Sequence, residues 1–206
     1  MIQYQHIHDT IEIVNNSVVG FELFRTFTDE PRSVEDFLSY CQSVAKIEVN
    51  DHPNHTHTGA LPRGMFIPFD DGHYEIVILP GQKYCWKRFV LCKELFHVLI
   101  DVNDKQKIFI NRDVDSHIEQ YMDKSNGLPN TPQNVQAETL AEIAAMEFLF
   151  PYAHRLEQLT SPSEKLAHKY MIPKALVEKY ILTHYMDGLN PDTIEAALIN
   201  QEEPNA

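Results

Sequence analysis

Lys93, Glu94 and His97 are spaced so that together they could support metal or acid–base chemistry. On a helix, residues four apart lie on one face, so Lys93, His97 and Asp101 form a stripe with Glu94 beside it. In the zinc-peptidase pattern H-E-x-x-H, the two His residues hold the metal and the Glu activates its water. This chain reads K-E-x-x-H: Lys93 stands at the first ligand position, Glu94 at the base and His97 at the second ligand.

The element that must position these residues is a helix expected from about Lys87 to Ile100. Before it, the segments 64–69 and 74–79 flank the turn residues Asp70-Asp71-Gly72, which predicts a hairpin. With a strand at 46–49, the sheet is expected to be small and mainly antiparallel. Further along, Thr131-Pro132 can begin a long helix that runs to about Phe150 and carries Glu138 on one face.

Other helices surround this centre. Apolar spacing predicts one over 9–27, and Ser33 can cap another that ends near Val44. The sequence S-P-S-E at 161–164 has the form of a capping box. Helices are expected over 162–170, 173–185 and 192–200, the last capped by Asn190-Pro191, with a short one at 116–121. The expected fold is α+β, with a domain at 1–160 and a helical C-terminal extension at 161–206 packed on it, or one continuous domain.

Composition narrows the classes of function. The 206 residues carry 30 acidic against 17 basic side chains, a formal charge of −13, which argues against nonspecific nucleic-acid binding. No apolar run approaches the roughly 20 residues that cross a bilayer. The odd number of cysteines, without C-x-x-C spacing, is typical of free thiols in a reducing compartment, so a cytoplasmic protein is expected.

The motifs resemble those of one family. R-F-V-L-C-K-E-L-F-H-V-L at 88–99 resembles R-F-T-L-A-H-E-L-G-H-x-L of the ImmA/IrrE metallopeptidases. E-T-L-A at 138–141, followed by F-L-F-P at 148–151, is similar to that family's E-x-x-A…L-L-M-P, and L-A-H-K-Y-M-I-P at 166–173 is similar to its L-A-x-x-F-x-V-S. The likeness covers about residues 33–182 in the same order.

This resemblance implies a zincin-like domain with a central active-site helix. It also implies zinc held by the His residues of that helix and by the Glu matching Glu138, with Glu94 as the catalytic base. Characterised members act in bacterial cells, where they cleave DNA-binding transcriptional repressors and so induce mobile-element, phage or stress-response genes. A protein partner, such as a repressor, follows from the same resemblance.

Three departures bear on activity: Lys93 replaces the first His, Phe96 replaces a Gly, and Asp101 stands where the family often has a further His. A lysine amine must lose a proton, with a pKa of about 10.4, before it can bind a metal. We therefore expect the Lys93 ammonium to take over part of the metal's charge, pairing with Glu138 or Glu94. Two functions remain: a repressor-cleaving peptidase with an unusual zinc site on His97 and Glu138, or an inactive relative that binds a protein partner.

The alternatives at this site stay open. Asp101 could complete a substitute triad with His97 and Glu138, or it could orient the His97 ring or face water. Glu142 competes with Glu138 as the site carboxylate. Without Glu138, His97 would be read as a hydrogen-bonded core histidine.

Two other regions offer residues that could bind a ligand. The histidines at 52, 55 and 57 could bind a metal weakly, although a solvated loop is favoured. The C-terminal helix pair could be a DNA-binding helix-turn-helix, with Lys165, Lys169, Lys174 and Lys179 as its cations. The acidic chain favours instead a helical appendage that packs on the core or receives a protein partner.

Overall fold

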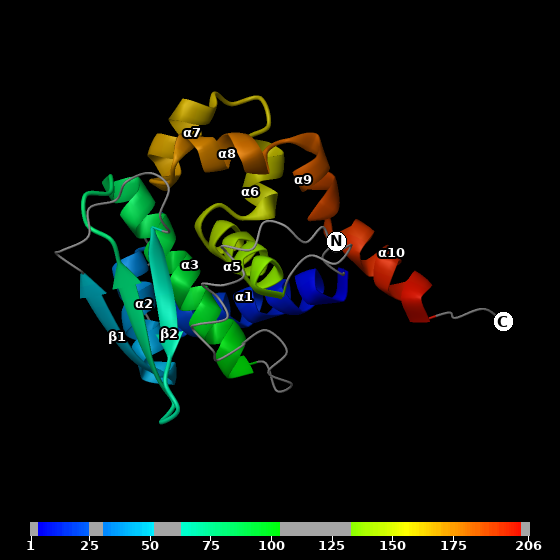
Figure 1. Ribbon diagram of the computed structural model, residues 1–206. Coiled ribbons are helices and arrows are strands. Elements are labelled where there is room, and N and C mark those ends of the chain that lie inside the picture. The colour runs from blue at the N-terminus through cyan, green and yellow to red at the C-terminus, as the bar shows by residue number, and fades with distance from the viewer. Residues whose placement is uncertain (1–3, 25–30, 52–62, 104–132, 203–206) are drawn as a thin grey trace, which may run out of the picture.

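The computed structural model describes residues 4–24, 31–51, 63–103 and 133–202 of the chain. It mixes helices with one small sheet, so the expected α+β class is confirmed at that level. Figure 1 shows the sheet at the left, beside α2 and α3, with α7 and α8 at the top and α10 at the right. The elements are α1 (Tyr4–Phe24), α2 (Val34–Val44), β1 (Lys46–Asp51), β2 (Gly64–Pro68), β3 (His73–Ile78), α3 (Tyr84–Asn103), α5 (Gln133–Leu149), α6 (Tyr152–Glu157), α7 (Ser163–Tyr170), α8 (Lys174–Tyr180), α9 (Thr183–Gly188) and α10 (Pro191–Glu202).

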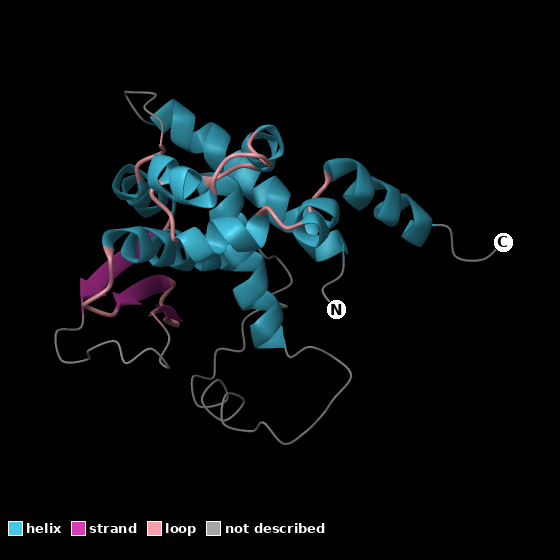
Figure 2. Cartoon of the chain, turned by 90° about the horizontal axis from the view of Figure 1, so that it is seen from above, coloured by secondary structure: helices cyan, strands magenta, loops and turns pink. Residues whose placement is uncertain are grey.

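The sheet has the order β1-β3-β2, and Figure 2 shows it at the edge of the helices. β2 and β3 form the predicted hairpin, in which Phe66 pairs with Ile76 and Gly72 adopts a φ of 80° in the turn. The expectation of a mainly antiparallel sheet was wrong, because β1 pairs with β3 in parallel. A tight turn forces β2 and β3 to be antiparallel. The connection from β1 to β3 spans residues 52–72 and includes β2, which is long enough for β3 to return parallel to β1.

Two helix caps were predicted correctly. The Asp36 amide donates to Ser33 Oγ at 3.1 Å, and the Asp192 amide donates to Asn190 Oδ1 at 2.9 Å. The capping box at 161–164 was wrong: α7 begins after Pro162 without a side-chain cap, and the Ser161 hydroxyl donates instead to Gln158 Oε1 at 2.9 Å. That local hydrogen bond withdraws the serine from the helix end.

Several boundaries differ from the sequence expectations. α1 begins at Tyr4, and α3 extends about one turn beyond the predicted helix in each direction. The helix expected over 173–185 is broken into α8 and α9. Across this break, the ring centroids of Tyr180 and Tyr185 lie 5.1 Å apart. α6 was not expected. The histidines at 52, 55 and 57, the short helix at 116–121 and Thr131-Pro132 lie outside the described residues.

The core is built around α3, which is buried along most of its length between the sheet and the other helices. Four fully buried phenylalanine rings join α1, α2, α3 and α5. The ring centroid of Phe37 lies 4.1 Å from that of Phe148 and 5.2 Å from that of Phe96, and the centroids of Phe21 and Phe148 are 5.5 Å apart. Burial of each ring contributes about 1.5–3 kcal/mol. Phe96, a departure from the family motif, is therefore a packing residue that holds α3 in place.

The C-terminal helices share this core. Leu166, Tyr170 and Val177 belong to the same hydrophobic cluster as the α3 side chains. The buried Arg88 of α3 donates from Nη1 to the carbonyl oxygens of Tyr170 at 2.7 Å and Met171 at 3.3 Å. This link fixes the α7–α8 turn against the start of α3. Within the described ranges, no helix is both long enough and apolar enough to cross a membrane.

Candidate functional site

The packing of α3 against α5 brings the predicted site residues together. Lys93 Nζ lies 2.6 Å from Glu138 Oε2 and 3.2 Å from Glu94 Oε1. The predicted ion pair of Lys93 is confirmed, and the ammonium binds both carboxylates rather than one of them. Glu94 is its helix neighbour, whereas Glu138 comes from a different helix.

His97 completes the cluster. Its Nε2 atom lies 3.2 Å from Glu138 Oε1 and 4.0 Å from Glu94 Oε2. The imidazole ring stacks on Phe66 of β2, with ring centroids 4.8 Å apart and planes 8° from parallel. Sequence reasoning missed Phe66, because the strand pattern identifies β2 but does not say which of its side chains faces α3.

Burial makes the charges of this cluster consequential. Glu94 is 1% exposed and His97 is 5% exposed, whereas the side chain of Glu138 keeps 46% of its accessible surface. Burial alone would lower the pKa of Lys93, but the charges of Glu94 and Glu138 outweigh it and raise that pKa above its ordinary value. Lys93 therefore stays an ammonium ion at neutral pH. An ammonium ion has three donors and no lone pair, so it cannot act as a metal ligand.

Glu138 shows the complementary effect. Burial alone would raise its pKa, but the contact with His97 and the positive charge of Lys93 outweigh burial and hold that pKa well below its usual range. Its carboxylate thus stays ionised and bridges the imidazole of His97 and the ammonium of Lys93. The cluster is held by charge pairing around Lys93.

Asp101 and Glu142 are engaged elsewhere. The Tyr74 hydroxyl of β3 donates to Asp101 Oδ2 at 2.6 Å, which ties the end of α3 to the sheet. Glu142 Oε1 accepts hydrogen bonds from the Tyr180 hydroxyl at 3.0 Å and from the Lys179 ammonium. Each of these carboxylates therefore has its own partner away from Lys93.

A catalytic zinc needs three protein ligands and one open position. In the parts of the chain that the structure describes, only His8, Asp9 and Glu12 bring three candidate ligand atoms within 4.8 Å of one another. These three lie exposed on α1, where Gln5 donates to Asp9 at 2.6 Å, so this group has the features of an ordinary solvated helix face. At the predicted site the donors are His97 and Glu138, with an ammonium ion beside them. This donor set does not fit a catalytic zinc.

Comparison with family models and with curated proteins gave no match for the chain. The likeness to the ImmA/IrrE family therefore stays a hypothesis that depends on the motifs at 88–99, 138–151 and 166–173 and on their order. The geometry of the Lys93 cluster stands independently of it.

Proposed function

We propose that this protein is a metal-free relative of the ImmA/IrrE zinc peptidases, and that it acts by binding a protein partner without cleaving it. The observation that carries the proposal is the position of Lys93 Nζ between Glu94 and Glu138, at 3.2 and 2.6 Å. In this proposal the Lys93 ammonium supplies the positive charge that a metal ion supplies in an active zincin.

The physical argument is one of charge. Two carboxylates beside a buried imidazole, one of them the buried Glu94, are costly to bring together without a cation. An ammonium ion removes that cost and lets the fold persist. It offers no open coordination position and cannot lower the pKa of a bound water, so hydrolysis loses its source of nucleophile.

The competing function is a working peptidase with zinc on His97 and Glu138 and with Glu94 as base. Such a base must be free to take a proton from the attacking water. Glu94 is 1% exposed and paired with Lys93, which favours the inactive relative. A DNA-binding repressor of the kind that family members cleave is the proposed partner class.

The test is the zinc content of the purified, untagged protein, measured by metal mass spectrometry. We expect almost no zinc in the protein with native Lys93 and near-equimolar zinc in Lys93→His, because the substitution supplies the missing third ligand. Lys179→His is the matched control, since Lys179 also pairs with a carboxylate of α5 and should gain no zinc. All proteins should carry His8→Ala, which removes a ligand from the exposed group on α1.

The other outcomes are also informative. Equimolar zinc in the protein with native Lys93, lost on His97→Ala, would contradict the metal-free proposal and direct attention to peptidase assays. Zinc in neither Lys93 nor Lys93→His protein would contradict the zincin-like scaffold itself.

A further inference from the structure

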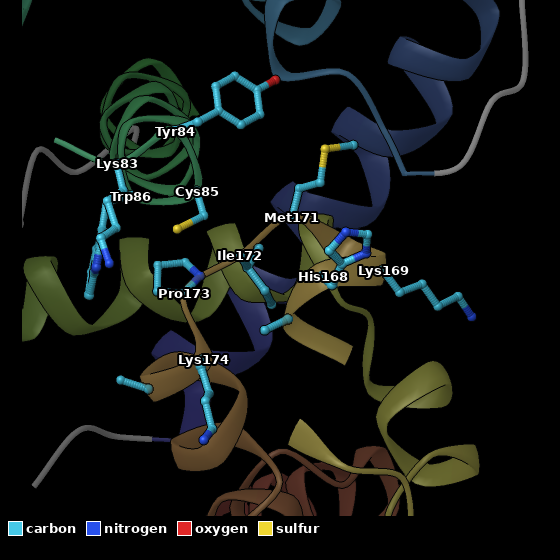
Figure 3. Close-up of a pocket in the computed structure, with 12 residues that line it drawn as sticks. Lys83, Tyr84, Cys85, Trp86, His168, Lys169, Met171, Ile172, Pro173 and Lys174 are labelled. Atoms are coloured by element: carbon cyan, nitrogen blue, oxygen red, sulfur yellow. The ribbon is translucent and has the colours of Figure 1, made fainter. Parts of the chain in front are cut away.

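A groove of about 880 Å³ lies between the start of α3 and the α7–α8 turn (Figure 3). Residues 83–86 form one side, and residues 167–169 and 171–175 form the other. In Figure 3 the segment from Met171 to Pro173 connects α7 to α8. None of Lys93, Glu94, His97 and Glu138 lines this groove.

Hydrogen bonds from α3 fix one wall of the groove. Arg88, 3% exposed, donates to the carbonyl oxygens of Tyr170 and Met171 and so anchors the α7–α8 turn to α3. Met171 has a φ of 51°, the only positive value among the described residues other than glycine. Met171 is the left-handed C-cap of α7, and its amide donates to the carbonyl oxygen of His168 at 3.3 Å, so this backbone conformation ends the helix. The Met171 residue is 37% exposed.

The charge of the groove is opposite to that of the molecule. The chain carries a net charge of −13, yet Lys83, Lys169 and Lys174 line the groove together with no aspartate or glutamate. Lys174 also lies 3.5 Å from Glu178, so Lys83 and Lys169 supply most of the uncompensated charge. A groove of this kind attracts a ligand that is acidic over a short length.

Apolar and aromatic groups accompany the lysines. Tyr84 is 58% exposed, and Trp86 lies under the Arg63 guanidinium, whose carbon is 3.8 Å from the ring centroid. Aromatic residues, methionine and arginine are enriched in protein-binding surfaces, and tyrosine and tryptophan bury a large area at low entropic cost because they have only two χ angles. Trp86 and Met171 thus provide apolar contacts between the positive charges.

We propose that this groove binds a short acidic segment of a partner protein, with an apolar side chain of that segment packed against Met171 and Trp86. This proposal deepens the protein-binding function given above and rests on it. Its test measures peptide binding at the groove, whereas the zinc measurement concerns the Lys93 cluster. The two proposals can therefore fail separately.

A nucleic acid is the competing ligand, because α7 and α8 form a helix pair with lysines. An extended polyanion would reach beyond the groove onto a chain whose net charge is −13, and nucleic-acid binding needs many clustered cations. A short peptide engages only the local lysines. The charge balance therefore favours the acidic peptide.

Trp86 is the only tryptophan of the chain, so its fluorescence reports directly on the groove. The probe is the acetylated peptide EDELFDEDE, titrated into the full-length protein. We expect a saturable change in Trp86 fluorescence with half-saturation below about 1 mM, weakened by added salt. The peptide KKKLFKKKK, which keeps the apolar residues and reverses the charge, should give no saturable change.

Charge-reversal variants locate the binding. Lys83→Glu and Lys169→Glu should each weaken binding of EDELFDEDE about ten-fold or more, because like charges then face each other. Lys46→Glu is the matched control: Lys46 is an exposed lysine of β1, 3.7 Å from Asp71, and lies outside the groove lining. It should bind the peptide as the wild type does.

A second variant guards against misfolding as an explanation. Met171→Gly suits the left-handed backbone, so the protein should fold at least as stably while losing the apolar contact. We expect weaker peptide binding together with an unchanged or higher unfolding midpoint.

Three results would overturn the proposal. One is the absence of any saturable response to EDELFDEDE. Another is equal weakening by Lys46→Glu, which would indicate attraction to the whole surface. The third is a Trp86 response to a single-stranded DNA oligonucleotide of equal charge but not to the peptide, which would assign the groove to nucleic acid.

Discussion

Two carboxylates of α5, Glu138 and Glu142, lie one helical turn apart, and each binds a lysine from another helix. Glu138 holds Lys93 of α3, and Glu142 holds Lys179 of α8. Their surroundings differ. Glu142 has one ammonium and the Tyr180 hydroxyl, so its charges balance, whereas Lys93 serves two carboxylates with His97 close by.

This difference separates a structural ion pair from the remains of a cation site. The side chains of Lys179 and Glu142 are 35% and 24% exposed, as in a common interhelical pair. The Lys93 cluster buries Glu94 almost completely and has more carboxylates than ammonium ions. A metal site also gathers carboxylates and an imidazole around one cation, which is why Lys93 can occupy the metal's position in our proposal.

The largest expected effect comes from removing the ammonium. Lys93→Met should lower the free energy of unfolding by about 3 kcal/mol, because it leaves the buried Glu94 without a partner. Lys179→Met should cost about 1 kcal/mol or less, since both side chains of the Lys179–Glu142 pair reach solvent. Urea denaturation at neutral pH measures both values.

A double variant checks the cause of that loss. Glu94→Gln combined with Lys93→Met should recover part of the stability, because the uncompensated charge is gone. Equal losses in Lys93→Met and Lys179→Met, with no recovery in the double variant, would remove the distinction between the two clusters.

Acid should act on the Lys93 cluster through Glu138. The folded-state pKa of Glu138 lies below its unfolded value of about 4.3, so its contribution is fully present above that pH and is lost as pH falls toward the folded pKa. The urea midpoint of the wild type should therefore fall as the pH drops below about 4.3, and that of Glu138→Gln should fall less. Parallel pH profiles would show that Glu138 is not held ionised by its neighbours.

Alkali should act on the Glu142 cluster through Tyr180, with the smallest effect. Burial, followed by the charge of Glu142, raises the pKa of Tyr180 well above its ordinary value. Its contribution is thus fully present below the unfolded pKa of about 10 and is lost as pH rises above it. Tyr180→Phe should cost about 1 kcal/mol at pH 7 through the lost hydrogen bond and should show a shallower alkaline decline. An alkaline decline as steep as that of the wild type would contradict this assignment.

Features set by neighbouring residues could be predicted from the sequence. The stripe of Lys93 and His97 on α3 follows from helical periodicity, and the Ser33 and Asn190 caps follow from side chains that reach amides two or three residues on. The β2–β3 hairpin follows from its turn residues. The pairing of Lys93 with a carboxylate was also predictable, since Glu94 is adjacent and the motif likeness pointed to Glu138.

Tertiary packing alone decided which distant groups meet. The ring of Phe66 stacks on that of His97, and the Tyr74 hydroxyl donates to the Asp101 carboxylate. The Arg88 guanidinium donates to the carbonyl oxygen of Met171. The parallel pairing of β1 with β3 belongs with them, because no local pattern fixes the direction in which a strand returns after a long connection. Backbone periodicity acts over a few residues, whereas these contacts depend on how whole elements bury their apolar faces. The sequence therefore determined that Lys93, Glu94 and His97 lie together on α3, and the packing of α3 against α5 brought Glu138 to them.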